Sequence, residues 1–167
     1  LPIYDREERL MRALGFYNSG NKYSYKGATP LTDALLGIRY IISNEEMWAS
    51  NLSLCEQTMN KYVYENQQNL ALGYMVNPTL EQWKIVEGDP FVTQNDFVRL
   101  ATDTQEALFT PMTVSEPEVT GGMLTSTGED KYFYERTADN GTLTWQLTFT
   151  EQQDVYIYFE ASHCEKL

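Results

Sequence analysis

The spacing of apolar residues changes partway along the chain, and this change limits the folds that the sequence can adopt. Over residues 143–149 apolar and polar side chains alternate, the period of a strand with one buried face. Residues 131–136 and 155–159 are rich in aromatic and β-branched residues, and Asn140-Gly141 favours a tight hairpin turn. The sequence therefore predicts an antiparallel β-meander within residues 111–167.

The preceding part of the chain shows helical signals instead. Residues 5–14 carry a partial apolar stripe that ends at Gly15, and Asp89 with Pro90 begins a helix predicted over residues 90–102. Shorter segments complete this prediction: helices over 44–48 and 79–86, and strands over 38–42, 62–65 and 70–76.

Together these elements predict an α+β fold, with N-terminal helices and short strands followed by a sandwich-like β-meander. We expect one domain over residues 1–167, with a mixed α/β subregion at 1–110 and an antiparallel β subregion at 111–167. Since the chain ends soon after a predicted strand, we expect an incomplete sheet and a piece of a longer polypeptide.

The charge of the chain excludes several classes of partner. Twelve basic residues stand against 24 acidic ones, and half of the acidic ones fall within residues 101–167. A chain this acidic, without a basic cluster, is a poor candidate for binding nucleic acid or an anionic membrane surface. No stretch approaches the roughly 18 apolar residues of a membrane span. The acidic part is best explained as a solubilising face. A site for divalent cations is the alternative, but the carboxylates are too sparse to show the spacing of such a site.

The cysteines and the histidine match no known metal or redox spacing. Cys55 and Cys164 are compatible with a disulfide outside the cytoplasm or with two buried thiols. A single histidine, His163, leaves too few ligands for a closed zinc site. No cofactor or metal is expected.

No recognisable catalytic motif is present, and tyrosine is the notable excess, with 12 of 167 residues. Glu65, between Tyr64 and Asn66, is the first carboxylate to consider for chemistry. Tyr23 and Tyr25 lie in a polar loop, and other tyrosines form i, i+2 pairs that share one face of a strand. Such faces suit sugar rings, although β-sheets also favour tyrosine for packing alone.

Several segments together resemble the YfhO family of bacterial membrane proteins. The first block consists of Leu14-Gly15-Phe16, residues 21–27 (NKYSYKG) and residues 29–40 (TPLTDALLGIRY). Tyr64-Glu65-Asn66, residues 71–76 (ALGYMV), Asp89-Pro90-Phe91 and Gln94-Asn95 follow in the same order, and residues 155–159 (VYIYF) are similar to a later strand. The first block is the most specific part of the resemblance.

The resemblance implies an extracytoplasmic domain of a multi-spanning bacterial membrane protein similar to C-type glycosyltransferases. Family members are linked to glycosylation of lipoteichoic acid with a polyprenyl-phosphate sugar donor. Their catalytic acid belongs to an early external loop that has no counterpart here, so no catalytic residue is assigned. The implied partners are the membrane-embedded part of the same polypeptide and a glycan or teichoic-acid polymer.

The candidate ligand-binding residues come from these segments and from the polar loop. They are Lys22, Tyr23, Tyr25, Lys26, Asp33, Arg39, Glu65, Asn66 and Asn95. The expected function is an accessory domain that holds a substrate for an active site built elsewhere. Two alternatives stay open: a carbohydrate-binding module with a tyrosine-rich surface, and a purely structural or interaction domain.

Overall fold

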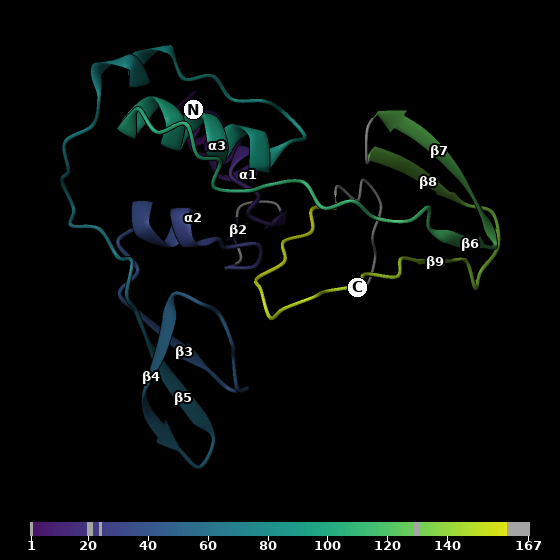
Figure 1. Ribbon diagram of the computed structural model, residues 1–167, viewed down its shortest axis with the longest axis horizontal. Helices are drawn as coiled ribbons and strands as arrows, with labels where there is room; N and C mark the ends of the chain where they lie inside the picture. The colour runs from purple at the N-terminus through teal and green to yellow at the C-terminus, as the bar shows by residue number, and fades with distance from the viewer. Residues whose placement is uncertain (1, 20–21, 24, 129–130, 160–167) are drawn as a thin grey trace. The chain divides into compact units, whose positions relative to one another are not determined.

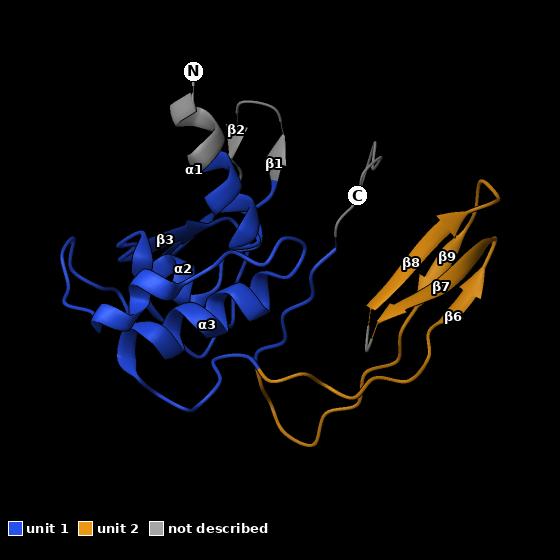
Figure 2. Cartoon of the chain, turned by 90° about the horizontal axis from the view of Figure 1, so that it is seen from above, with its two compact units in different colours: residues 1–109, 154–167 blue, residues 110–153 orange. Residues whose placement is uncertain are grey.

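The computed structural model describes residues 2–19, 22–23, 25–128 and 131–159, without the side chains of 2–6, 18–19 and 22–23. The chain divides into two compact units (Figure 2). Unit 1 comprises residues 1–109 and 154–167, and unit 2 comprises residues 110–153. Helices and antiparallel strands in small open sheets confirm the α+β class.

Unit 1 contains all the described helices. They are α1 (Pro2–Ala13), α2 (Pro30–Leu35), the 3₁₀ helix η1 (Pro78–Gln82) and α3 (Pro90–Thr102). The predicted start of α3 is confirmed, because the Asp89 carboxylate accepts a hydrogen bond from the Val92 amide at 3.0 Å and Pro90 follows as the first helical residue. Asp103 ends this helix in the left-handed conformation, with φ of 59°.

The three-stranded sheet of unit 1 has the order β3-β5-β4, with antiparallel pairing throughout (Figure 1). Its strands are β3 (Tyr40–Ser43), β4 (Leu52–Thr58) and β5 (Lys61–Asn66), and a two-residue pair, β1 (Asn18–Ser19) with β2 (Lys22–Tyr23), completes the unit. β3 and β5 match predicted strands. β4 was not predicted, because its sequence LSLCEQT does not sustain an apolar alternation. The structure agrees with this, since the strand is almost wholly exposed.

Four predictions in unit 1 are wrong in type or extent. The predicted helix at 79–86 is the shorter 3₁₀ helix η1, and residues 44–48 form no helix. The predicted strands at 70–76 and 155–159 are irregular. In the second of these, the Tyr156 ring packs edge-on against Phe109, with ring centroids 5.3 Å apart. Tyr156 therefore packs without a neighbouring strand, whereas Val155, Ile157 and Phe159 stay exposed.

Unit 2 contains β6 (Glu118–Thr120), β7 (Gly122–Gly128), β8 (Lys131–Arg136) and β9 (Thr142–Thr144). β7 pairs with β8 and β6 pairs with β9, so the strands nest as one long interrupted hairpin. The predicted turn at Asn140-Gly141 does not join paired strands, which corrects the meander prediction. It lies in an excursion where the amides of Thr137 and Ala138 both donate to the Gly121 carbonyl.

The core of unit 1 combines a few buried apolar residues with a buried polar network. The buried apolar side chains are Ala13, Leu14, Phe16, Ala34, Tyr64 and Ala101. Gln94 of α3 is fully buried; its amide donates to the Leu14 carbonyl at 3.0 Å and accepts from the Thr29 hydroxyl at 2.6 Å. Three segments distant in sequence are thus joined through one side chain.

Candidate functional site

Asp33 is held in place by the first turn of α2. Thr29 caps this helix, and the Thr29 and Thr32 side chains form a reciprocal capping box with each other's backbone amides. Asp33 follows in the same turn and is only 5% exposed. The Tyr25 hydroxyl, from the preceding loop, donates to Asp33 Oδ1 at 2.5 Å. The structure therefore brings together two of the predicted ligand-binding residues.

Burial dominates the electrostatics around this pair. It raises the pKa of the Asp33 carboxyl, although the hydrogen bond from Tyr25 acts in the opposite direction. The pKa of Tyr25 is also raised, by burial and then by its contact with Asp33. Burial, with the nearby carboxylates of Asp154 and Asp33, raises the pKa of Tyr156 to about 12. The cluster thus disfavours negative charge and is unsuited to binding an anion.

The raised pKa of Asp33 predicts a pH-dependent penalty on folding. Below pH 3.8, the ordinary pKa, folded and unfolded chains both keep the proton. As the pH rises, the unfolded chain releases it first, so ionisation favours the unfolded state until the folded-state pKa is passed. The D33N variant keeps an oxygen for Tyr25 but cannot ionise. We therefore expect its free energy of unfolding, relative to the unaltered chain, to increase between pH 4 and pH 7.

Urea unfolding at both pH values measures this difference. E106Q removes an exposed carboxyl outside this pair and serves as the control for the loss of one negative charge. A D33N variant whose relative stability declines over the same interval would show that the Asp33 carboxylate is stabilised in the folded state.

A second pair of predicted residues meets on the three-stranded sheet. The Arg39 guanidinium and the Glu65 carboxylate form an ion pair at 3.2 Å, in which Arg39 is exposed and Glu65 is partly buried. Beside them Asn66 is fully buried; its amide donates to the Ile38 carbonyl, and its side-chain oxygen accepts from Asn51 and from the Gln68 backbone. These contacts give Asn66 a structural role at the end of β5.

The other predicted residues are separate from both pairs. Asn95 exchanges two 2.8 Å hydrogen bonds with the backbone of Phe109, as a neighbouring strand residue would. Lys26 is exposed, and the side chains of Lys22 and Tyr23 lie outside the described residues. Tyr62 and Tyr64 share a face as predicted and stack with centroids 6.4 Å apart, but Tyr64 is buried. That pair is therefore not an exposed platform for a sugar.

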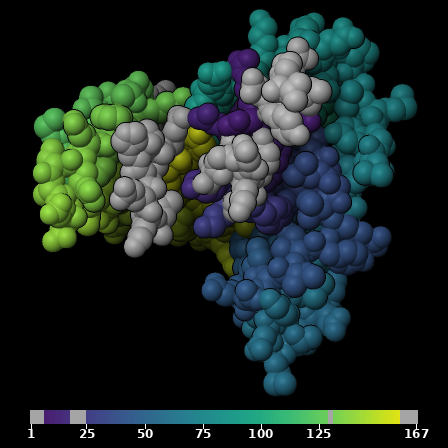
Figure 3. Space-filling view, turned by 180° about the vertical axis from the view of Figure 1, so that it is seen from behind, coloured from purple at the N-terminus to yellow at the C-terminus, as the bar shows by residue number. Residues whose placement is uncertain are grey.

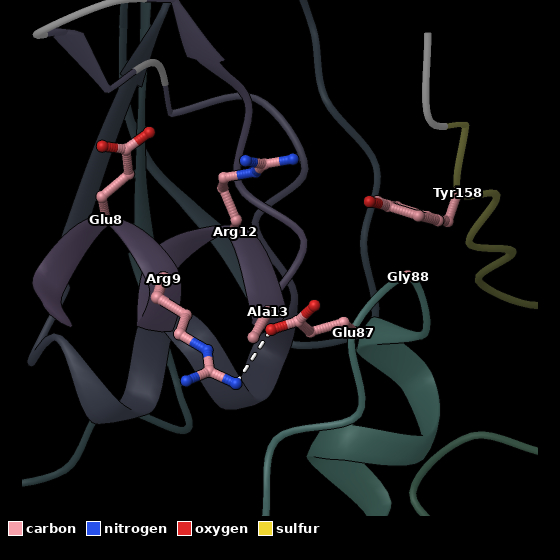
Figure 4. A pocket seen from close by; sticks show the side chains of 7 residues that line it. All are labelled: Glu8, Arg9, Arg12, Ala13, Glu87, Gly88 and Tyr158. Carbon is pink, nitrogen blue, oxygen red and sulfur yellow. Dashed lines mark ion pairs between the residues drawn. The ribbon is translucent and has the colours of Figure 1, made fainter. Parts of the chain in front are cut away.

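An open pocket of about 410 Å³ lies at the end of α1 (Figure 4). Its lining residues are Glu8, Arg9, Arg12, Ala13, Glu87, Gly88 and Tyr158. The Arg12 guanidinium and the Tyr158 hydroxyl face one another across it, and Arg9 pairs with Glu87 at 2.8 Å. Figure 3 shows the N-terminal part of the chain, in purple, on the face of the molecule seen from behind.

The chemistry of this pocket suits a ligand with both hydroxyl and anionic groups. Guanidinium groups bind phosphate oxygens, carboxylates accept hydrogen bonds from hydroxyls, and a tyrosine ring packs against a sugar. Its volume falls within the usual range for small-ligand sites.

The exposed pair of Arg9 with Glu87 contributes only about 0–1 kcal/mol to folding. The i, i+3 spacing of Arg9 and Arg12 on a helix was the sequence signal for this pocket.

Among the residues that the structure describes, no group of three or more His, Cys, Asp or Glu side chains could hold a metal ion. Cys55 is exposed on β4, and Cys164 lies outside the described part, so the pairing of the two stays a prediction. Within the described ranges, no helix combines the length and apolar character needed to cross a bilayer.

Comparison with known proteins identifies the family. The model of a family described as bacterial membrane protein YfhO matches residues 5–166, nearly the whole chain. No curated protein and no solved structure matches significantly. The match confirms the resemblance seen in the sequence: the chain belongs to the YfhO family of bacterial membrane proteins.

Proposed function

We propose that the chain is an extracytoplasmic accessory domain of a multi-spanning, glycosyltransferase-like membrane protein that acts on cell-envelope polymers such as lipoteichoic acid. Membership of a bacterial membrane protein family carries this proposal. The domain holds the polymer, and the catalytic groups that transfer sugar from a polyprenyl-phosphate donor lie elsewhere in the parent protein.

The pocket at the end of α1 supports a polymer-holding role. Its two arginines are ligands for a glycerol-phosphate unit, and its glutamates and Tyr158 provide partners for hydroxyl groups and sugar rings. The net charge of −12 would repel a polyanion elsewhere on the surface. Local arginines therefore concentrate binding at one place, and we expect added salt to weaken it.

The R12Q variant tests this assignment. Because a hydrogen bond to a charged group contributes about 1.5–3 kcal/mol, we expect R12Q to weaken binding of a glycerol-phosphate oligomer at least about tenfold. Isothermal titration calorimetry of the 167-residue chain measures the change.

R99Q is the matched control, since Arg99 lies exposed on α3, outside the pocket, and pairs with Asp96 at 3.1 Å. We expect its affinity to stay close to that of the unaltered chain. Equal affinities for R12Q and the unaltered chain would place the polymer somewhere other than this pocket.

A further inference from the structure

One ion pair in the pocket at the end of α1 joins two parts of unit 1 that are distant in sequence. Arg9 belongs to α1 and Glu87 to the segment before α3, and Arg9 Nη2 lies 2.8 Å from Glu87 Oε1 (Figure 4). Both residues line the pocket that the proposed function assigns to the polymer. A ligand phosphate that binds Arg9 therefore has to compete with the Glu87 carboxylate.

A short turn fixes the backbone that carries Glu87. The Asp89 amide donates to the Val86 carbonyl at 3.3 Å, and Gly88, the third residue of the turn, has φ of +73°. A type II turn requires positive φ at this position, where glycine is favoured. The fully buried Thr93 hydroxyl donates to the Val86 carbonyl at 3.1 Å and accepts from the Val86 amide at 3.0 Å. The turn is thus held in place independently of the ion pair.

The two side chains of the ion pair are accessible to solvent. The Arg9 side chain is 64% exposed, and the Glu87 side chain is 73% exposed. Exposed ion pairs are weak, because water and salt screen the attraction and because two long side chains lose conformational freedom when they pair. The Glu87 carboxylate can therefore leave Arg9 by rotation of its side chain while the turn keeps its conformation.

We propose that the Glu87 carboxylate is a built-in competitor, which a ligand phosphate replaces on Arg9. This inference rests on the proposed function, in which the pocket holds a glycerol-phosphate polymer, and it adds how binding there is regulated. A guanidinium uses the same N–H donors for a carboxylate and for a phosphate, so one anion displaces the other. The released carboxylate then accepts a hydrogen bond from a hydroxyl group of the polymer.

The competition also favours release of the polymer. Because the turn holds Glu87 in the pocket, its carboxylate is always at high local concentration beside a phosphate bound to Arg9. It returns to the guanidinium as the phosphate leaves, and it thereby lowers the affinity of the site. A domain that passes a polymer to a catalyst needs such reversible contacts. The charge of Glu87, rather than its size, is the cause of this effect.

The E87Q variant tests the proposal, since glutamine keeps the size of the side chain and removes its charge. An exposed ion pair corresponds to a factor of up to about five in an equilibrium constant. We therefore expect E87Q to bind a glycerol-phosphate oligomer at least about threefold more tightly than the unaltered 167-residue chain does. Isothermal titration calorimetry measures the change. Unchanged or weaker binding in E87Q would overturn the proposal.

E81Q is the matched control for the loss of one negative charge. Glu81 lies in η1, is exposed and does not line the pocket. The affinity of E81Q for the oligomer should match that of the unaltered chain. An equal gain in E81Q and E87Q would overturn the proposal, because the overall charge of the chain would then explain both.

A chain that lacks the Arg9 guanidinium shows whether Glu87 acts through it. When R9Q is already present, we expect E87Q to raise the affinity for the oligomer by less than about twofold, because no ion pair is left to be released. An equal or larger gain in R9Q/E87Q would contradict the proposal, since Glu87 would then repel the phosphate directly. Unfolding curves establish that each variant is folded at the temperature of the titration.

These titrations separate this inference from the proposed function. If the unaltered chain and E87Q bind the oligomer equally well, Glu87 is not a competitor, while the polymer-holding role stands. If neither of them binds the oligomer, the proposed function fails and this inference fails with it. Tighter binding in E87Q alone, lost when R9Q is present, supports both.

Discussion

Replacement of Gln94 by leucine is expected to lower the free energy of unfolding of unit 1 by about 2–4 kcal/mol. The side chain is fully buried, and it serves both the Leu14 carbonyl and the Thr29 hydroxyl. Leucine has a similar size but leaves both groups without this partner in a site that water does not reach. Chemical denaturation of the 167-residue chain measures the loss.

Q105L provides the control for this prediction. Gln105 is exposed just beyond the end of α3, so leucine there should change stability by no more than about 0.5 kcal/mol. If Q94L and Q105L had the same stability, the polar network would not contribute to holding α3 against the segments around Leu14 and Thr29.

The G27A variant is expected to lose at least about 2 kcal/mol of stability. Gly27 has φ of +85°, a conformation that an L-residue adopts only with strain. A β-carbon at this position would also collide with the carbonyl oxygen of Gly15, which itself has φ of +92°. This close approach of the two backbone segments fixes the loop in which Tyr25 reaches Asp33. We therefore expect G27A to disturb the hydrogen bond between Tyr25 and Asp33 as well.

G73A is the matched glycine control. No atom lies within 4 Å of the β-carbon that alanine would add at Gly73. We expect its stability to stay within about 0.5 kcal/mol of the unaltered chain. Equal denaturation midpoints for G27A and G73A would contradict the close approach of Gly15 and Gly27.

The sequence predicted correctly those helices and strands that depend mainly on interactions between neighbouring residues. Asp89 and Pro90 fix the start of α3 by chemistry within one helical turn, so the helix was found at its observed bounds. The α+β class also followed from the change of apolar spacing. In contrast, the strand predictions failed at 70–76, at 155–159 and, beyond Thr144, at 143–149. A strand needs a partner, and composition alone cannot provide one.

Long-range contacts account for the rest of what was missed. The pairing of β6 with β9 around β7 and β8 depends on contacts between strands, so the Asn140-Gly141 turn signal was assigned to the wrong connection. The burial of Gln94 could not be predicted from the sequence, because its hydrogen-bond partners are 65 and 80 residues away. The pocket combines α1, the segment before α3 and Tyr158, so its lining depends on contacts between parts of the chain that are distant in sequence.

The proposed role of this domain is to hold an anionic cell-envelope polymer for a catalyst in the membrane. Its most direct test is a calorimetric titration of the unaltered 167-residue chain with poly(glycerol phosphate), beside a neutral oligosaccharide of similar length. We expect saturable binding of the phosphate polymer that weakens with added salt and exceeds binding of the neutral chain. Absence of saturable binding to the phosphate polymer would contradict the polymer-holding role.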